Sequence, residues 1–371
     1  MQKIKVLHII KSLGRGGAET LLPETLKLHN SEKFEFHYIY FLPWKDQMVD
    51  AIEVQGGKVT CLAASNNLKL LQQYPAVINY CKKHAIDLIH CHLPWSGFLG
   101  RIVYAKTKIP VIYTEHNIQE RYHIITKLLN KSTFNSQSIA LGVSKDVSRS
   151  IKQHIKPKIP IQTLLNGVNT DKFTRNPLKA QSIRDQYGIP EEAVVIGNIA
   201  VFREQKCIPD WLNAFKKISD KNNNTYGLLV GAGPLETEIK TLVKELKLEK
   251  NVILPGLQTD TVSYFSAMDI FMMSSAFEGL PIALLEAMSM QCAVISTRAG
   301  GVVEVVRDSK DGLLCDVGDT KNMADLAVGL LNDKDKRVAF QNAARARVVD
   351  SFSLTNMVSE LEKVYTKCNE V

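Results

Sequence analysis

The chain has 371 residues and a mass of 41.5 kDa, enough for two domains that each bury a core of their own. Hydrophobic residues make up 45% and charged residues 23%, which excludes disordered and fibrous proteins. The net charge of +8 belongs to the first half, because residues 1–165 hold 22 Lys and Arg against 11 Asp and Glu.

Near the amino terminus, residues 4–10 form an apolar run that is broken by His8 and is too short for a signal peptide. No uninterrupted apolar stretch approaches the roughly 18 residues that a membrane-spanning helix needs. We therefore expect a cytoplasmic protein without an integral membrane segment. Seven cysteines with no Cys-x-x-Cys pair predict buried, reduced thiols.

The first half alternates short β-branched runs with amphipathic helical stretches, such as 18–29 and 74–84. Its predicted strands are 4–10, 34–42, 58–63, 86–93, 110–116 and 138–144. Strands that alternate with helices predict a parallel sheet with right-handed crossovers. The first half is therefore predicted to be an open α/β domain.

The first strand leads into the segment GRGGAETLL at 14–22. Gly16 and Gly17 permit close approach of the backbone, and a helix that begins near Ala18 would point its free amides at a ligand. A dinucleotide fingerprint is the competing interpretation, but Glu19 replaces its last glycine, and no acidic residue follows the second strand. We predict a phosphate near these glycines, with a tight turn that binds nothing as the alternative.

The segment His90-Cys91-His92 suggests a metal site. It lies at the end of one predicted strand, however, with no second pair of ligands nearby in the sequence. We interpret both histidines as polar residues at the mouth of a strand and predict no metal.

A basic stretch follows, because residues 101–158 hold 11 basic and 3 acidic side chains. This excess predicts docking on an anionic membrane or on an anionic lipid-linked acceptor. A solvated surface that only keeps the domain soluble is the alternative.

Residues 166–193 are polar and contain Pro and Gly, so we interpret them as a linker. The second half then repeats the alternation, and residues from 322 onward are predicted to be helical. Its predicted strands are 193–202, 225–233, 251–256, 269–275, 292–297 and 312–317. Two open α/β domains that face one another would form an interdomain cleft, with ligands at the carboxyl ends of the strands.

The segment FEGLPIALLE at 277–286 follows a predicted strand and begins a helix. Pro281 suits the first helical position, and the next two amides are then free to bind an anion such as a diphosphate. Glu278 precedes this anion site, and Glu286 lies about 7.5 Å beyond Pro281 along the helix axis. Two carboxylates on either side of a phosphate site predict a pocket for a nucleotide sugar. An ordinary capped helix is the alternative.

Six segments spread along the chain form a wider pattern. They are GGAE at 16–19, TEHN at 114–117, GVSKDV at 142–147, NGVNTDKF at 166–173, GAGP at 231–234 and EGLPIALLEAM at 278–288. Together they resemble family 4 of the retaining glycosyltransferases, and the last segment is the most specific. The resemblance implies the GT-B fold, in which two Rossmann-like domains with parallel sheets face a cleft.

The resemblance also implies how the domains divide the work. Residues 1–165 would form an acceptor-side domain, and residues 166–351 would bind the nucleotide-sugar donor. A final helix, about 352–371, would pack back on the first domain.

Individual roles follow from the same resemblance. Glu278 would contact the hydroxyls of the donor sugar, and Glu286 those of the ribose. His116 is similar to the family's cleft histidine near the transferred sugar, and Lys206 to the lysine that offsets the diphosphate charge as this group leaves. The implied donor-binding residues are Gly16, Gly17, Gly279, Leu280, Ile282, Ala283 and Glu286.

The chain departs from the family pattern five residues before the lysine, where the family usually has Gly-Arg. Ala200 and Val201 occupy these positions, so we expect Arg203 to supply the guanidinium from a shifted position. The predicted catalytic residues are Glu278, His116, Lys206 and Arg203.

The implied activity is retaining transfer of a hexose or N-acetylhexosamine from a nucleotide sugar to a glycan or lipid-linked saccharide in cell-surface polysaccharide synthesis. UDP-sugars are favoured and GDP-mannose is second. A nucleotide-sugar epimerase on the same fold and a non-catalytic module that binds sugar nucleotides are the alternatives.

No metal or other cofactor is expected, because a helix dipole, Lys206 and Arg203 would neutralise the diphosphate. We interpret Asp333 and Asp335, in a short DKD segment, as solvated surface. The expected partners are the nucleotide sugar, the saccharide or lipid-linked acceptor and an anionic membrane, with no nucleic acid. The expected location is the cytoplasm, peripheral on the inner face of the membrane.

Overall fold

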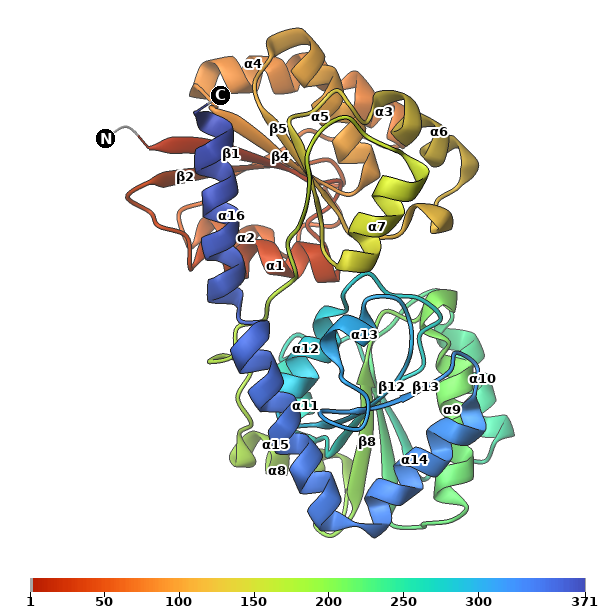
Figure 1. Cartoon of the computed structure of the whole chain (residues 1–371). Coiled ribbons are helices and arrows are strands. Elements are labelled where there is room, and N and C mark those ends of the chain that lie inside the picture. The colour runs from red at the N-terminus through yellow and green to blue at the C-terminus, as the bar shows by residue number, and fades with distance from the viewer. Residues whose placement is uncertain (1–2, 371) are drawn as a thin grey trace. The chain divides into compact units, whose positions relative to one another are not determined.

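The computed structural model describes residues 3–370 and divides into two compact units. Unit 1 runs as far as Asn166 and includes the segment from Leu354 onward, whereas unit 2 is Gly167–Ser353. The boundaries predicted from the sequence were 165/166 and about 352. Each unit is an α/β domain built on one parallel sheet, as Figure 1 shows.

The sheet of unit 1 has seven parallel strands in the order β3-β2-β1-β4-β5-β6-β7. They are β1 (Ile4–Ile9), β2 (Phe34–Tyr40), β3 (Lys58–Cys61), β4 (Leu88–His92), β5 (Val111–Glu115), β6 (Ile139–Gly142) and β7 (Ile161–Thr163). The six predicted strands of this half are confirmed, and β7 was not predicted. Because β2 and β4 flank β1 on opposite sides, the strand order reverses between β1 and β4, which makes this the switch point of the sheet.

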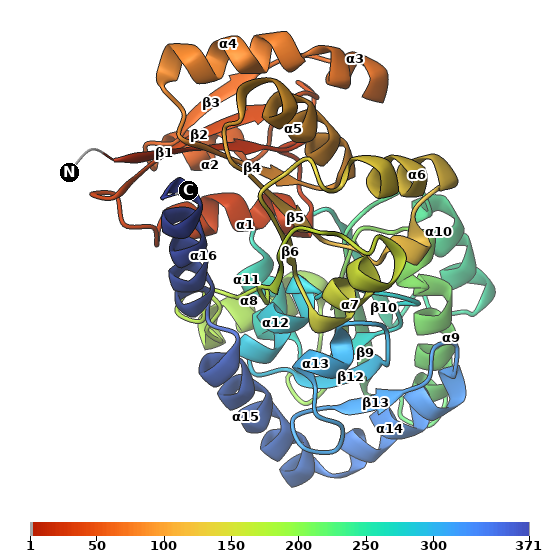
Figure 2. The same cartoon turned by 45° about the horizontal axis from the view of Figure 1, so that its top comes forward.

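Helices cover both faces of this sheet. They are α1 (Gly17–Leu26), α2 (Val49–Glu53), α3 (Asn67–Gln72), α4 (Tyr74–His84), α5 (Pro94–Thr107), α6 (Ile124–Thr133), α7 (Lys145–His154) and α16 (Leu354–Asn369). Helices α1, α2 and α16 contribute Leu22, Ile52 and Tyr365 to one core with the strands. Helices α3, α4 and α5 lie on the other face, as Figure 2 shows. The carboxyl-terminal helix is therefore part of unit 1.

The sheet of unit 2 has six parallel strands in the order β10-β9-β8-β11-β12-β13. They are β8 (Val194–Ile199), β9 (Thr225–Val230), β10 (Val252–Gly256), β11 (Ile270–Met273), β12 (Ala293–Thr297) and β13 (Leu313–Cys315). All six match predicted strands. The switch point of this sheet lies between β8 and β11, because β9 occupies the other side of β8.

The helices of unit 2 are α8 (Pro177–Tyr187), α9 (Ile208–Ser219), α10 (Glu236–Glu245), α11 (Thr261–Ala267), α12 (Ile282–Ser289), α13 (Val302–Val305), α14 (Thr320–Asn332) and α15 (Lys334–Ser351). Helices α9, α10 and α14 pack with the sheet in one core. This core contains the fully buried Trp211 of α9. The predicted helical tail is confirmed as α14, α15 and α16. None of the helices within residues 3–370 combines the length and the hydrophobicity that crossing a bilayer demands.

The segment predicted to be a linker contains helix α8, so that prediction was wrong. The side chain of Asn176 caps the start of the helix, and Gly188 ends it at a φ of +63°. Arg184 then binds Asp269 with a nitrogen–oxygen distance of 3.1 Å, which ties α8 to unit 2. The polar residues of this segment are caps and ion-pair partners of a packed helix.

The aspartates of the DKD segment lie on the surface, as the sequence indicated. Asp333 and Asp335 are both exposed. The carboxylate of Asp333 accepts a hydrogen bond from the amide of Lys336 at 2.9 Å and caps α15. The presence of Asp333 at this position is therefore explained by its role as a helix cap.

Candidate active site

The loops that follow β8, β9 and β11 meet at the carboxyl edge of the unit 2 sheet. The hydroxyl of Ser274, after β11, donates to the carbonyl of Lys206, after β8, at 2.9 Å. The amide of Leu235, after β9, donates to the carbonyl of Phe202 at 3.2 Å. These loops surround the switch point, which is where open α/β sheets bind ligands.

Lys206 and Glu278 form an ion pair between two of these loops. The Lys206 Nζ and Glu278 Oε1 atoms are 2.5 Å apart, and the two side chains are 22% and 6% exposed. Charges shielded from water in this way interact more strongly than a surface pair. The sequence assigned both residues to the site but did not predict that they touch.

Helix α12 begins at Ile282, directly after the loop that carries Glu278. Pro281 is the N-cap, with φ −73° and ψ 119°, so the prediction that it is the first helical residue was wrong by one position. Its extended backbone leads directly into the first turn of the helix. The amides of Ile282 and Ala283 have no acceptor within the helix, and the dipole gives this end a partial positive charge.

Three other residues of this segment differ in accessibility. Glu286 is half-buried in the second turn of α12, and Gly279 is also half-buried. Leu280 is only 4% exposed, because its side chain is part of the core. A ligand would therefore meet the backbone of Leu280 and not its side chain.

Arg203 lies on an open pocket of about 530 Å³ beside the ion pair. The pocket is lined by Arg203, Glu204, Gln205, Pro234, Leu235, Ala276 and Phe277. The side chain of Arg203 is exposed and free of the core. Gly233 lets the loop after β9 approach, since a Cβ at this position would lie 2.5 Å from the carbonyl oxygen of Phe202.

Gly16 and Gly17 begin helix α1 in unit 1, Gly16 as the N-cap and Gly17 as the first residue. The Glu19 carboxylate lies against Gly16, where a Cβ would stand 2.3 Å from its Oε2 atom. The same carboxylate accepts a hydrogen bond from Ser12 at 3.1 Å. An acidic group thus already occupies the electropositive end of α1, so α12 is the better anion site of the two.

Glu115, the last residue of β5, anchors the loop that carries His116. It is fully buried and accepts hydrogen bonds from Tyr113 at 2.9 Å, Gln119 at 2.7 Å and Tyr122 at 2.5 Å. The amide of His116 donates to the same carboxylate at 3.0 Å. This network holds His116 at the carboxyl edge of the sheet.

Burial keeps His116 neutral, because it lowers the pKa of the imidazole to about 4. Its Nε2 atom is buried and bonds to no other atom of the described chain. Burial also raises the pKa of Glu115, although its hydrogen bonds act in the opposite direction. A neutral imidazole whose Nε2 atom is uncommitted can donate to or accept from a ligand hydroxyl.

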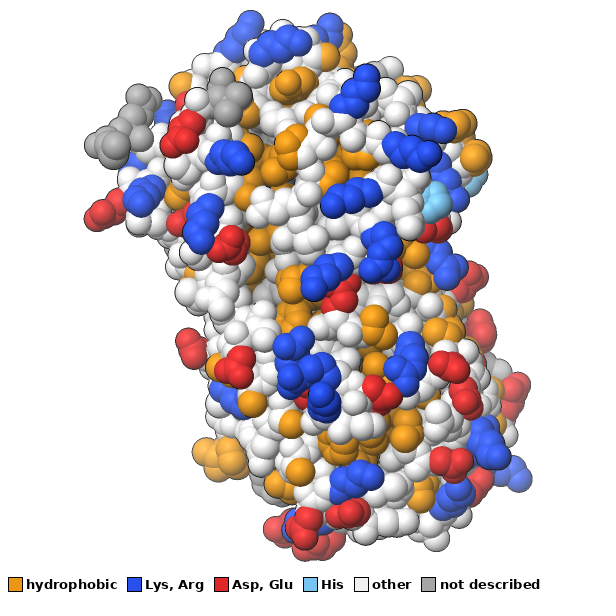
Figure 3. All heavy atoms as spheres, viewed as in Figure 1, with side chains coloured by type: hydrophobic (Ala, Val, Ile, Leu, Met, Phe, Trp, Pro, Cys, Tyr) orange, Lys and Arg blue, Asp and Glu red, His pale blue; other side chains and the backbone are white. Residues whose placement is uncertain are grey.

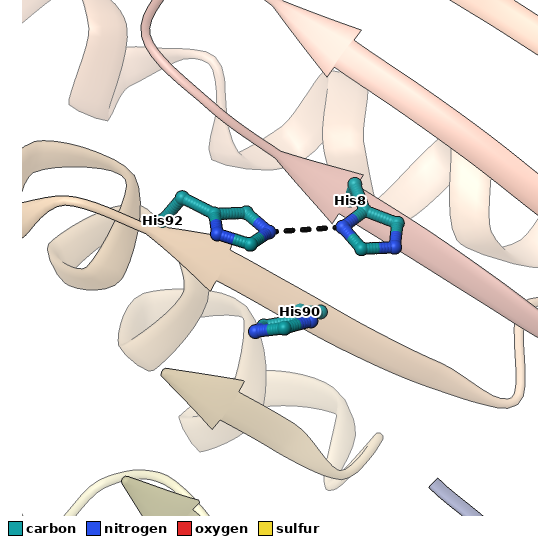
Figure 4. A group of neighbouring side chains, drawn as sticks. All are labelled: His8, His90 and His92. Carbon is teal, nitrogen blue, oxygen red and sulfur yellow. Dashed lines mark hydrogen bonds between the residues drawn. The ribbon is translucent and has the colours of Figure 1, made fainter. Parts of the chain in front are cut away.

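A buried histidine cluster occupies the switch point of unit 1. His8 on β1 lies opposite His90 on β4, and His8 Nδ1 is 2.9 Å from His92 Nε2 (Figure 4). The imidazole of His90 bonds to the Tyr365 hydroxyl at 2.8 Å and to the Thr114 hydroxyl at 2.7 Å. One nitrogen from each histidine lies within 4.8 Å of the others.

This cluster corrects the interpretation of His90 and His92 as polar groups at a strand mouth. His8, His90 and His92 are 3%, 1% and 6% exposed, so all three are core residues. The sequence missed the cluster because His8 lies 84 residues before His92. Three histidines offer metal ligands, but both nitrogens of His90 already have hydrogen-bond partners, so a metal would have to displace one of them.

The structure thus brings Lys206, Glu278 and the start of α12 together in unit 2. It places His116 in unit 1, at the end of β5. Sequence reasoning missed Glu115, and its position directly before His116 at a strand end was the signal that could have found it.

Two family models match the chain on either side of residue 175. "Glycosyltransferase Family 4" matches residues 15–172, and "Glycosyl transferases group 1" matches residues 179–347. Together they span both units and contain every residue of the candidate site.

Relatives with a named activity point to the same class of enzyme as the two family models. The chain is 28% identical over 296 residues to an N-acetyl-alpha-D-glucosaminyl L-malate synthase of Bacillus anthracis, covering 76% of this chain and 75% of the relative. It is 24% identical to the UDP-Gal:alpha-D-GlcNAc-diphosphoundecaprenol alpha-1,3-galactosyltransferase of Escherichia coli, covering 98% and 97%. The crystal structure of Anabaena HepE with UDP and glucose superimposes with a TM-score of 0.88 at 19% identity, covering 98% and 100%. The chain therefore belongs to the group 1 and family 4 glycosyltransferases and is a transferase with their GT-B fold of two Rossmann-like domains.

Proposed function

We propose that this glycosyltransferase moves a hexose or N-acetylhexosamine from a nucleotide sugar to a lipid-linked saccharide or glycan in cell-surface polysaccharide synthesis. UDP-sugars are favoured over GDP-mannose. The observation that carries the proposal is the shielded Lys206–Glu278 pair beside the start of α12. A cation and free amides suit a diphosphate, and a carboxylate suits sugar hydroxyls.

The relatives support this choice of substrates. The E. coli relative is named for UDP-Gal and a diphosphoundecaprenol-linked acceptor. HepE, which shares the fold, was solved with UDP and glucose. The basic stretch at 101–158 suits an anionic lipid-linked acceptor, and the location we propose is the cytoplasm, at the inner face of the membrane.

In the donor site, the amides of Ile282 and Ala283 would bind the diphosphate, with Lys206 and Arg203 supplying full positive charges. Glu286 would hold the ribose hydroxyls from the second turn of α12. Gly279 and the backbone of Leu280 would line the sugar side, where Glu278 binds hydroxyls. The family resemblance also assigns Gly16 and Gly17 of unit 1 to the donor phosphates.

During transfer, the bond between the anomeric carbon and the diphosphate oxygen breaks, and its electron pair leaves with the diphosphate. The acceptor hydroxyl bonds to the same carbon and gives its proton to an oxygen of the leaving diphosphate. Lys206 and Arg203 would stabilise the leaving diphosphate, and Glu278 would face the sugar as it becomes positive. The family resemblance assigns the neutral His116 to the same developing charge. The role of each residue is to offset charge where it develops.

We propose that the anomeric configuration is retained. An inverting reaction needs a general base that is free to deprotonate the acceptor, and burial makes His116 a weak base because it lowers the pKa of the imidazole to about 4. Glu278 is instead bonded to Lys206 at 2.5 Å and is largely buried, which suits a group that stabilises charge. The family pattern of the segment at 278–288 also supports retention.

Labelled donors test the proposal. The purified enzyme is incubated with UDP-glucose, UDP-galactose, UDP-GlcNAc, UDP-GalNAc and GDP-mannose, each with and without lipid-linked acceptors extracted from cells, and Lys206→Ala serves as the inactive control. Transfer that needs the lipid acceptor, with an unchanged anomeric configuration by NMR, supports the proposal. An inverted linkage overturns retention, and a donor that is isomerised without acceptor overturns the transfer.

A further inference from the structure

Helix α6 in unit 1 exposes apolar side chains and buries polar ones, which is the reverse of an ordinary helix packed on a core. Its apolar residues Ile124, Ile125 and Leu128 are 59%, 55% and 60% exposed. Its polar residues Thr126 and Asn130 are 8% and 0% exposed. A surface helix normally buries its apolar face, so this arrangement breaks a general rule of packing.

The buried polar face of α6 has specific partners. Asn130 donates to the Gln119 side chain at 2.9 Å and accepts from Arg101 at 3.0 Å. Arg101 also donates to the Thr133 hydroxyl at 3.0 Å, and its guanidinium is buried among aromatic rings. A polar network therefore fixes the orientation of α6 and holds its apolar face outward.

Basic residues accompany the apolar face. Lys127 and Lys131 belong to α6, Arg121 precedes it, and residues 121–145 contain no Asp or Glu. Figure 3 shows hydrophobic and basic side chains mixed at the upper right, where Figure 1 labels α6. A helix with outward aliphatic side chains and neighbouring cations has the composition of an interfacial membrane helix.

We propose that the outward face of α6, formed by Ile124, Ile125, Leu128, Lys127 and Lys131, docks on an anionic membrane. The inference rests on the proposed function, because a lipid-linked acceptor is presented at a membrane. The cations are attracted to anionic headgroups, and the aliphatic side chains enter the boundary between headgroups and acyl chains. The surface delivers unit 1 to its acceptor.

Charge favours a membrane over a second copy of the chain. Two copies that met through α6 would bring Lys127 and Lys131 of each close to the same groups of the other, and residues 121–145 contain no Asp or Glu to offset them. An anionic headgroup layer supplies the missing negative charge. The apolar face and the charge thus point to the same occupant.

Vesicle binding tests the inference with the full-length protein. Flotation with phosphatidylglycerol vesicles should recover the wild type, and phosphatidylcholine vesicles should not. The triple variant Ile124→Ser/Ile125→Ser/Leu128→Ser should lose about a hundredfold in partition coefficient. Lys127→Gln/Lys131→Gln should lose about fivefold for each lysine at low salt. Wild-type binding should weaken as salt rises.

Leu178→Ser is the matched control, because Leu178 is a leucine of α8 in unit 2 that is 83% exposed. It should bind vesicles like the wild type. Wild-type binding by the triple variant, or no binding by the wild type, overturns the inference. Self-association in light scattering that the triple variant abolishes also overturns it, since the face would then pair two copies.

Nucleotide-sugar binding separates this inference from the proposed function. A thermal shift of the wild type by UDP-sugars reports the donor site of unit 2, which the α6 variants leave unchanged. A protein that binds UDP-sugars but ignores vesicles overturns only the docking surface. A protein that floats with vesicles but binds no nucleotide sugar overturns only the proposed substrates.

Discussion

The two units place different chemistry at the same position of similar sheets. At the switch point of unit 1, His8 and His90 lie within neighbouring strands and are buried. At the switch point of unit 2, Lys206 and Glu278 lie in the loops beyond the strand ends and form an ion pair that remains partly open. Burial makes the first group neutral and structural, whereas the loop position leaves the second group charged and within reach of a ligand.

The largest expected effect is a loss of stability in acid. It should occur in unit 1 and not in unit 2. Burial lowers the pKa of His90 to about 3 and that of His116 to about 4, and it lowers those of His8 and His92 well below 6.5. These histidines are neutral when folded, but in the unfolded chain they bind protons below pH 6.5. Stability is therefore complete above pH 6.5 and falls as the pH drops toward the folded-state values.

Between pH 7.5 and pH 5.0, each histidine that stays neutral should cost unit 1 about 2 kcal/mol of unfolding free energy. Unit 2 has no histidine, since all nine lie before residue 155. Hydrogen exchange measured by mass spectrometry should show unit 1 opening first on acidification. His90→Gln should flatten the pH dependence of unit 1, and the exposed His123→Gln should not. Equal loss of protection in both units would contradict the prediction.

The next prediction concerns the charged switch point of unit 2. Lys206→Ala should lower kcat about a hundred- to a thousandfold, because the leaving diphosphate loses a preorganised cation. The matched control is Lys240→Ala, which removes the lysine of an exposed pair with Glu236 at 2.6 Å. That variant should remain near wild type, because exposed pairs contribute little.

Removing Lys206 also leaves the shielded Glu278 carboxylate unpaired, which lowers stability. The double variant Lys206→Ala/Glu278→Gln removes that charge and should recover the melting temperature without recovering turnover. Recovery of both would show that the pair is structural. A kcat for Lys206→Ala within about threefold of wild type would lead to the same conclusion.

Periodicity predicted most of the strands, because alternating buried runs and helices leave a local signal. The segment at 277–286 also predicted the start of α12 to within one residue, since Pro and the following apolar run mark a helix end. These features depend only on neighbours in the chain. The sequence was therefore sufficient for the fold class and for one side of the candidate site.

Features that depend on the order of the strands could not be predicted. His8 meets His92 only because β1 and β4 are neighbours in the sheet. Helix α6 can bury its polar face because Arg101 of helix α5 donates a hydrogen bond to Asn130. This contact removes the need for an apolar inner face. Both cases involve long-range polar contacts, which leave no periodic pattern in a sequence.

A smaller effect distinguishes the two carboxylates of unit 2. Glu286→Ala should raise the donor KM about ten- to a hundredfold with little change in kcat, because it removes binding that is equal in ground and transition states. Glu278→Ala should lower kcat instead, since its contact with the sugar strengthens as charge develops. Glu238→Ala, an exposed glutamate of α10, is the control. Steady-state kinetics with equal circular dichroism spectra would decide, and near-wild-type values for both variants would leave α12 an ordinary capped helix.

The smallest expected effect is that of metal removal, which tests both switch points at once. Lys206, Arg203 and the start of α12 supply positive charge to a diphosphate, so EDTA should leave the turnover of the wild type unchanged. In unit 1 both nitrogens of His90 already bond to Tyr365 and Thr114, so EDTA should leave its melting temperature unchanged as well.

Magnesium makes the test of unit 2 sharper. Added Mg²⁺ should not accelerate the wild type, but it should restore part of the activity of Lys206→Ala, because a divalent cation can replace the missing positive charge at the diphosphate. Loss of wild-type turnover in EDTA, restored by Mg²⁺, would show that the protein cations are not sufficient. A lower melting temperature of unit 1 in EDTA would show that the three histidines hold a metal, and both switch points would then carry charge.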